Sequence, residues 1–154
     1  MNSIKNSERA YSIACDRNRG PIFSILKKIL PDTGRVLEVG SGSGQHISYF
    51  SSKLPNLDWL PSDLPQCLPD IRGWCEDSNE NCLPPVALDL LSDDIEFPNV
   101  SAVICINVVH IVSWVGVQNL FSAVSKCLNS GGVFYLYGPY RYSDKDLEPT
   151  NEEF

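Results

Sequence analysis

The chain has 154 residues, with 19 Asp and Glu against 12 Lys and Arg, and a formal net charge of −7. This length supplies one hydrophobic core but not two typical domains, and the acidic balance argues against a nucleic-acid partner, whose phosphates require a basic face. No apolar run approaches the about 18 residues of a membrane span, so no membrane partner is expected.

The amino terminus and the cysteines indicate the cellular compartment. Residues Met1–Asn6 lack the apolar core of a secretion signal. The six cysteines form no C-x-x-C pair and no repeated zinc-type spacing, although three of them between residues 67 and 82 leave a metal cluster as an alternative. We therefore expect a cytoplasmic protein, with a nuclear location left open, and no metal site. Reduced thiols are expected at Cys15, Cys67, Cys75, Cys82, Cys105 and Cys127.

The first predicted elements are a flexible segment, a helix and a buried strand. Residues 1–16 are polar and are predicted to be loosely held, so that one domain spans residues 17–154. Apolar residues recur at helical spacing from Ile22 to Leu30, with Pro21 suited to the first turn and Pro31 to the stop. The apolar run Val36–Val39 is typical of a short buried strand.

Three glycines at alternate positions, Gly40, Gly42 and Gly44, lead from this strand into a predicted helix. The missing Cβ atoms let the backbone turn tightly and let a ligand lie against it, beside the free N–H groups of the helix start. The dinucleotide pattern G-x-G-x-x-G fails because Gln45 holds the third small position. Glu38 suits an amino-acid moiety better than a diphosphate, which it would repel. The alternatives are a nicotinamide cofactor and a structural turn without a ligand.

The rest of the chain continues to alternate between helices and strands. The helix after the glycines ends at Pro55, and an irregular helix is predicted within residues 65–82. A helical stripe spans Trp114–Asn129, with a glycine stop at Gly131–Gly132. The predicted strands are Leu57–Asp63, Pro85–Leu90, Ser101–Asn107 and Val133–Tyr137. This order predicts an α/β fold with a parallel sheet and right-handed crossovers.

Four successive predicted strands end in polar side chains, Glu38, Asp63, Asp89 and Asn107. Ligands of open α/β sheets bind outside the carboxyl ends of the strands, so these side chains are expected to meet at one site. Asp63 lies about twenty residues past the glycine turn, where an acid accepts hydrogen bonds from both ribose hydroxyls. The set predicts a cofactor that contains a nucleoside.

The motifs together resemble the methyltransferase-like 26 family, also called domain of unknown function 938, within the class I S-adenosylmethionine-dependent methyltransferases. The resemblance implies a Rossmann-like, three-layer α/β/α fold with sheet order 3-2-1-4-5 and S-adenosyl-L-methionine as the cofactor. It spans nearly the whole chain and is carried by Arg17–Asn18, Pro21–Ile22, Val36–His46, Pro61–Asp63, Leu88–Asp89, Ile106–Asn107, His110–Ile111, Trp114 and Tyr137–Tyr140.

The resemblance also implies that the methyltransferase domain is incomplete at its carboxyl end. Class I methyltransferases carry strands 6 and 7 after the fifth strand, and this sequence holds no segment that corresponds to them. The apolar edge at Val133–Tyr137 would then be exposed, which natural proteins avoid. The alternatives are that this chain is a shortened product of a longer gene or that a partner chain covers this edge.

The expected site combines residue chemistry with the resemblance. Arginine forks match carboxylates, so Arg17 and Asn18 are expected at the cofactor carboxylate; the resemblance places Asp89 at the adenine amino group. His46 is expected to support the cofactor or the fold. His110 is the candidate catalytic base, because an imidazole accepts protons near neutral pH, unless it is a backbone-bonded loop histidine. The expected cofactor-binding residues are Arg17, Asn18, Glu38, Gly40, Ser41, Gly42, Gly44, His46, Asp63, Asp89, Leu90 and Asn107.

The function that follows is S-adenosylmethionine-dependent methyl transfer to an unknown acceptor, a small molecule or a protein rather than a nucleic acid. A first alternative is a catalytically inactive cofactor-binding fragment or partner subunit. A second is an NAD-dependent oxidoreductase, which the glycine spacing disfavours.

Overall fold

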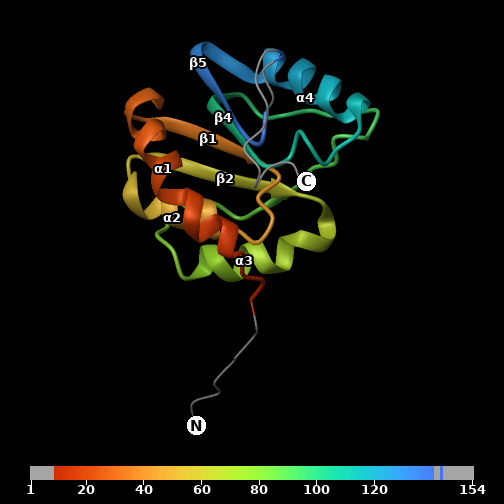
Figure 1. Cartoon of the computed structure of the whole chain (residues 1–154). Helices are drawn as coiled ribbons and strands as arrows, with labels where there is room; N and C mark the ends of the chain where they lie inside the picture. Colours follow the sequence, from red (N-terminus) through yellow and green to blue (C-terminus); the bar gives the residue numbers. More distant parts are fainter. Residues whose placement is uncertain (1–8, 141–142, 144–154) are drawn as a thin grey trace.

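The computed structural model describes residues 9–140 and residue 143. Its elements in chain order are α1 (Ile13–Ile29), β1 (Gly34–Val39), α2 (Gln45–Lys53), β2 (Leu57–Asp63), η1 (Pro65–Cys67), α3 (Leu68–Glu76), β3 (Val86–Ala87), β4 (Val100–Ile106), α4 (Trp114–Cys127) and β5 (Leu128–Tyr137). The five strands form one sheet in the order β3-β2-β1-β4-β5, and every pair is parallel (Figure 1). The predicted α/β fold and strand order are confirmed.

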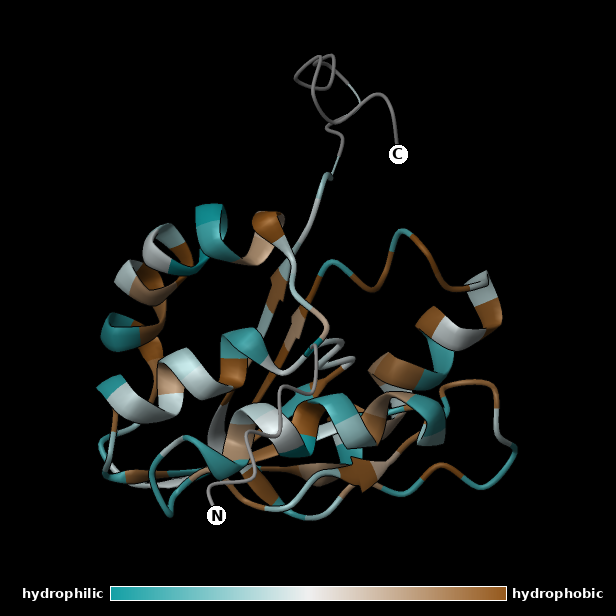
Figure 2. Cartoon of the chain, turned by 90° about the horizontal axis from the view of Figure 1, so that it is seen from below, coloured by the Kyte–Doolittle hydropathy of each residue, from teal (hydrophilic) through white to brown (hydrophobic). Residues whose placement is uncertain are grey.

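Helices cover both faces of the sheet and give three layers (Figure 1). Helices α1, α2 and α3 pack on one face, where Leu26 and Phe50 meet Trp59 in a buried cluster. Helix α4 packs on the other face, where Leu120 meets Leu37. The central strands β1 and β4 are buried on both faces along residues 36–39 and 102–106, where they are mostly apolar, and Figure 2 shows hydrophobic residues in brown within the sheet between the helices.

Helix α1 begins earlier than the sequence indicates, so the prediction of a start at Pro21 is wrong. The helix begins at Ile13, Ser12 is its N-cap, and Pro21 lies within it. The Ser12 hydroxyl accepts a hydrogen bond from the Cys15 N–H at 3.4 Å, which satisfies one free donor of the first turn. Helix α1 therefore includes residues 13–16, which the prediction assigned to a flexible segment.

Two strands also differ from their predicted bounds. Strand β3 contains only Val86 and Ala87, so the prediction of a strand from Pro85 to Leu90 is too long. Strand β5 begins directly after α4, so the predicted glycine stop of that helix is wrong. Gly131 instead has a φ of +76° inside a register shift between β4 and β5, where a residue without Cβ is favoured.

A disulfide links Cys75 in the last turn of α3 to Cys82, with Cα atoms 5.6 Å apart. The prediction that all six cysteines are reduced is therefore wrong for this pair. The chain returns from α3 to the sheet at this point, where Leu83 N–H donates to the Trp59 carbonyl at 2.8 Å, and this return brings Cys82 back to the helix. Cys15, Cys67, Cys105 and Cys127 are free.

Strand β5 is the outer strand of the sheet within the described residues. Its residues 133–137 are half-buried, and their coverage by a partner chain stays a prediction. Across the described part of the chain, no helix has both the length and the apolar character that crossing a membrane requires.

Candidate functional site

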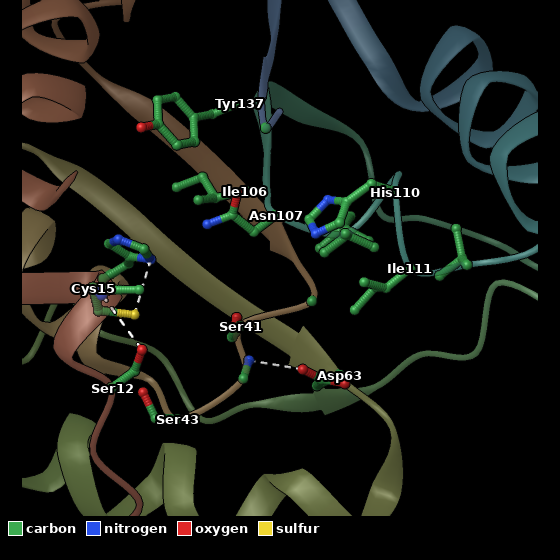
Figure 3. A pocket seen from close by; sticks show the side chains of 18 of the residues that line it. Ser12, Cys15, Ser41, Ser43, Asp63, Ile106, Asn107, His110, Ile111 and Tyr137 are labelled. Carbon is green, nitrogen blue, oxygen red and sulfur yellow. Dashed lines mark hydrogen bonds between the residues drawn. The ribbon is translucent and has the colours of Figure 1, made fainter. Parts of the chain in front are cut away.

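A cavity of about 1080 Å³ opens at the carboxyl ends of the strands (Figure 3). This volume is slightly above the roughly 300–1,000 Å³ typical of small-molecule sites, so the cavity has room for a drug-sized ligand. Its α1–β2 wall consists of lining residues from the start of α1, the glycine turn, His46 and the end of β2. Its β4–β5 wall consists of the lining residues within 106–113 and 137–139.

The glycine turn forms as predicted, and its three glycines differ in what surrounds them. Gly40, Gly42 and Gly44 have φ values of +74°, +58° and +91°. A Cβ on Gly40 would meet Val108 Cγ2 at 2.3 Å, and one on Gly44 would meet Ile71 Cα at 2.9 Å. A Cβ on Gly42 would meet no atom within 4 Å, and Gly42 lines the cavity. Gly40 and Gly44 therefore permit close packing, whereas Gly42 leaves room for a ligand beside the backbone.

Asp63 lies opposite Gly42 with its carboxylate fixed by backbone donors. The Gly42 N–H donates to Asp63 Oδ2 at 2.7 Å, as the dashed line in Figure 3 shows, and the Leu64 N–H donates to Oδ1 at 2.7 Å. Each carboxylate oxygen retains a second acceptor site. Asp89 also lines the cavity, and its Oδ1 accepts from the Leu91 N–H at 2.9 Å. The carboxylates of Asp63 and Asp89 are thus oriented by backbone N–H groups and can accept further hydrogen bonds.

Two residues expected at the ligand, Glu38 and Gly44, do not line the cavity. Glu38 is buried, and its Oε2 has no hydrogen-bond partner among the described residues. Burial and the nearby Asp63 raise the pKa of Glu38 to about 8, while a hydrogen bond with Ser41 acts in the opposite direction. Ser41 separates Glu38 from the cavity-lining surface, so direct contact of Glu38 with a cofactor stays a prediction.

Gln45 ties the start of α1 to the glycine turn. Its Oε1 accepts from the Ser12 N–H at 2.5 Å and from the Ser43 hydroxyl at 2.9 Å, and its Nε2 donates to the Ser12 carbonyl at 3.3 Å. Gln45, the residue that breaks the dinucleotide pattern, thus holds the start of α1 against the glycine turn. The sequence did not predict that the cavity is also lined by Ala10, Tyr11, Ser12 and Cys15. A local signal for a helix start was present, because Ser12 is a suitable N-cap and Asp16 is an acid in the first turn.

His46 is buried between α1 and α2 and lies at the edge of the cavity. Its Nε2 is 2.7 Å from Asn18 Oδ1, its Nδ1 is 3.7 Å from Cys15 Sγ, and its ring stacks on Phe50. Burial, assisted by the charge of Arg19, lowers the pKa of His46 to about 4. The imidazole is therefore neutral at physiological pH.

The β4–β5 wall is built from the ends of β4 and β5. Asn107 has a φ of +56°, a conformation that asparagine tolerates better than most residues, and its N–H donates to the Tyr137 carbonyl at 2.8 Å. His110 is exposed on the loop that follows and lines the cavity near Ile111 (Figure 3). The structure thus places His110 at the predicted site, while its catalytic role stays a prediction.

The structure brings most of the expected residues to one cavity. Its lining includes Arg17, Asn18, Gly40, Ser41, Gly42, His46, Asp63, Asp89, Leu90, Asn107 and His110. Within residues 9–140, Arg17 is the one Lys or Arg in this lining. Arg19 instead pairs with Asp16 at 3.1 Å and lies over the Tyr49 ring. The cavity thus carries a cation at α1 and carboxylates at the ends of β2 and β3.

The profile of a family described as "Protein of unknown function (DUF938)" matches residues 9–154. Among solved structures, PKMT2 from Rickettsia typhi in complex with AdoHcy has a TM-score of 0.59 at 24% identity, over 70% of this chain and 22% of that one. An O-methyltransferase family 2 protein from Planctomyces limnophilus in complex with apigenin has a TM-score of 0.68 at 20% identity, over 86% and 43%. CalO1, a methyltransferase in calicheamicin biosynthesis in its SAH-bound form, has a TM-score of 0.68 at 16% identity, over 89% and 40%.

These likenesses establish the fold, which is that of methyltransferases. The chain spans less than half the length of each of these three structures.

Proposed function

We propose that this chain, which belongs to the DUF938 family, acts as an S-adenosylmethionine-dependent methyltransferase of the methyltransferase-like 26 kind. The observation that carries the proposal is the order of charges along the cavity. Arg17 lies at α1, Gly42 has open space beside its backbone, and Asp63 and Asp89 lie at the strand ends. S-adenosylmethionine has a carboxylate at one end and a ribose and an adenine at the other, which matches this order.

The residues present fit each part of this cofactor. Asp63 retains acceptor sites for the two ribose hydroxyls, and Asp89 retains one for the adenine amino group. Arg17 and Asn18 suit the carboxylate. Glu38 forms a hydrogen bond with Ser41 and is mostly protonated below its raised pKa of about 8, and a ligand ammonium group beside Ser41 would favour its ionised form. The AdoHcy and SAH complexes of PKMT2 and CalO1 support the same choice, because S-adenosylhomocysteine is the product of the methyl donor.

When bound, the cofactor would supply a methyl group on a sulfonium whose thioether is an excellent leaving group. Catalysis then consists largely of positioning the acceptor in line with the methyl group. The β4–β5 wall orients the acceptor. His110 on this wall accepts a proton at an imidazole nitrogen if the acceptor must lose one. The buried apolar residues Ile106 and Val108 on the same wall limit the access of water to the reaction site. The net charge of −7 favours a small molecule or a protein over a nucleic acid as the acceptor.

The proposal is tested by isothermal titration of the chain with S-adenosylhomocysteine and, separately, with NAD⁺, with circular dichroism to verify that it is folded. We expect micromolar binding of S-adenosylhomocysteine and no binding of NAD⁺, because Gln45 takes the place of the third glycine of the dinucleotide pattern. Binding of NAD⁺ alone would support an oxidoreductase. Cofactor binding without transfer to any acceptor would support an inactive cofactor-binding subunit.

A further inference from the structure

Three side chains form a hydrogen-bonded row along the α1–β2 wall. Cys15 Sγ lies 3.7 Å from His46 Nδ1, and His46 Nε2 lies 2.7 Å from Asn18 Oδ1. Cys15 and Asn18 are one turn apart on α1, whereas His46 comes from α2, so the row joins the two helices. All three residues line the cavity.

The chemistry of the partners sets the direction of this row. An amide oxygen only accepts, so His46 Nε2 must carry the hydrogen that it shares with Asn18 Oδ1. Because burial keeps the imidazole neutral, Nδ1 has no hydrogen and accepts from the Cys15 thiol. The Asn18 amide is thereby fixed with its oxygen toward His46, and its nitrogen makes no hydrogen bond to another described residue. Its two N–H donors remain available beside Arg17.

We infer that His46 is a positioning residue that holds Asn18 with its amide N–H groups toward the cavity, so that Asn18 and Arg17 together select ligands that carry a carboxylate. This inference rests on the proposed function, because it assigns the amino-acid end of the cofactor to this wall. His46 acts through Asn18 and not as a cation, since a neutral imidazole offers a carboxylate no charge.

The groups packed around His46 agree with this indirect role. Arg19 is the cation that acts on it electrostatically, but Arg19 pairs with Asp16 and lies over Tyr49. Phe50 stacks on its ring, which fixes the plane of the imidazole. The row therefore has one orientation, and an amide that is already oriented loses less rotational freedom when a ligand binds.

The test compares S-adenosylhomocysteine with 5′-methylthioadenosine, which has the same nucleoside and sulfur but no amino-acid group. The quantity measured by titration is the ratio of the two dissociation constants. The variants are His46→Asn, whose amide is too short to reach Asn18, and His46→Gln, whose amide nitrogen stands near the position of Nε2. A third variant, Asn18→Asp, keeps the acceptor for His46 and replaces the N–H donors with a carboxylate oxygen.

In His46→Asn and Asn18→Asp we expect S-adenosylhomocysteine to bind about tenfold more weakly, the effect of one hydrogen bond to a charged group, with 5′-methylthioadenosine unchanged. We expect His46→Gln to restore most of the ratio. Equal weakening of both ligands would overturn the inference, because it would indicate a purely structural role. Unchanged binding of both ligands would overturn it as well. If the folded wild-type chain binds neither ligand, the proposed function is wrong, and the inference, which rests on it, is wrong as well.

Discussion

The two walls of the cavity are built in different ways. The α1–β2 wall contains Arg17 and Asp63, and backbone N–H groups of Gly42 and Leu64 hold the Asp63 carboxylate. Gln45 and His46 hold the start of α1 on this wall by hydrogen bonds to Ser12 and Asn18, which are distant in the sequence. Among the described residues, the lining of the β4–β5 wall contains no Lys, Arg, Asp or Glu. Ile111 on this wall and Trp114 just outside it are each 72% exposed. Because the α1–β2 wall presents oriented polar groups, whereas the β4–β5 wall is uncharged and mostly apolar, we propose that the cofactor lies along the first wall and that the acceptor faces the second.

The largest expected effect comes from removing the carboxylate that the α1–β2 wall holds in place. Asp63→Ala is expected to weaken S-adenosylhomocysteine binding by about a hundredfold, because two hydrogen bonds to a charged acceptor are lost. The matched control is Asp58→Ala, an exposed acid on the same strand, which should bind normally. Titration calorimetry measures both. Equal affinities for the two variants would disprove the ribose contact of Asp63.

The buried His46 makes the α1–β2 wall sensitive to acid. Its pKa is lowered from 6.5 to about 4, so between these values the unfolded chain binds more protons, and stability falls as the pH falls. From pH 7 to pH 5 the free energy of unfolding should drop by about 2 kcal/mol relative to His46→Asn. Glu38, whose pKa is raised, has the opposite slope, and it is present in both proteins.

Urea unfolding of the wild type and of His46→Asn at several pH values measures this difference. Two parallel stability curves would show that His46 is not held neutral, and the direction assigned to its hydrogen bonds would then be wrong.

Two glycine-to-alanine substitutions separate the cost of close packing from the cost of backbone strain, and their effect on stability is smaller. Gly44→Ala combines a positive φ with a Cβ placed 2.9 Å from Ile71 Cα, whereas Gly131→Ala has a positive φ but no atom within 4 Å of its Cβ. We expect losses in the free energy of unfolding of about 2 kcal/mol and about 1 kcal/mol respectively. Thermal unfolding of both variants checks this order. A Gly131→Ala loss as large as that of Gly44→Ala would remove the packing argument.

The smallest expected effect lies on the β4–β5 wall. His110→Ala should change S-adenosylhomocysteine affinity by less than about twofold, because a base on the acceptor side acts in the transfer step. Once an acceptor that must lose a proton is identified, the same variant should lower the transfer rate by about a hundredfold or more. A large loss of cofactor affinity would instead indicate that His110 contacts the cofactor, and it would contradict the assignment of the β4–β5 wall to the acceptor.

The sequence predicts the glycine turn and the strand ends better than it predicts the start of α1. Asp63, Asp89 and Asn107 follow apolar runs, and such local patterns identify strand ends, because the carboxyl ends of parallel strands share one edge. The start of α1 depends on Gln45, which bonds Ser12 across 33 positions of sequence. No local pattern records such a contact. The same holds for the Cys75–Cys82 disulfide, which depends on where the chain turns back to Trp59.

The assignment of the two walls is tested most directly by following backbone amide signals in heteronuclear NMR spectra as S-adenosylhomocysteine is added. We predict the largest shifts at Gly42 and Leu64, whose N–H groups donate to Asp63, and much smaller shifts at residues 111–113 of the β4–β5 wall. The reverse pattern, or a folded chain whose spectrum does not change, would contradict the account.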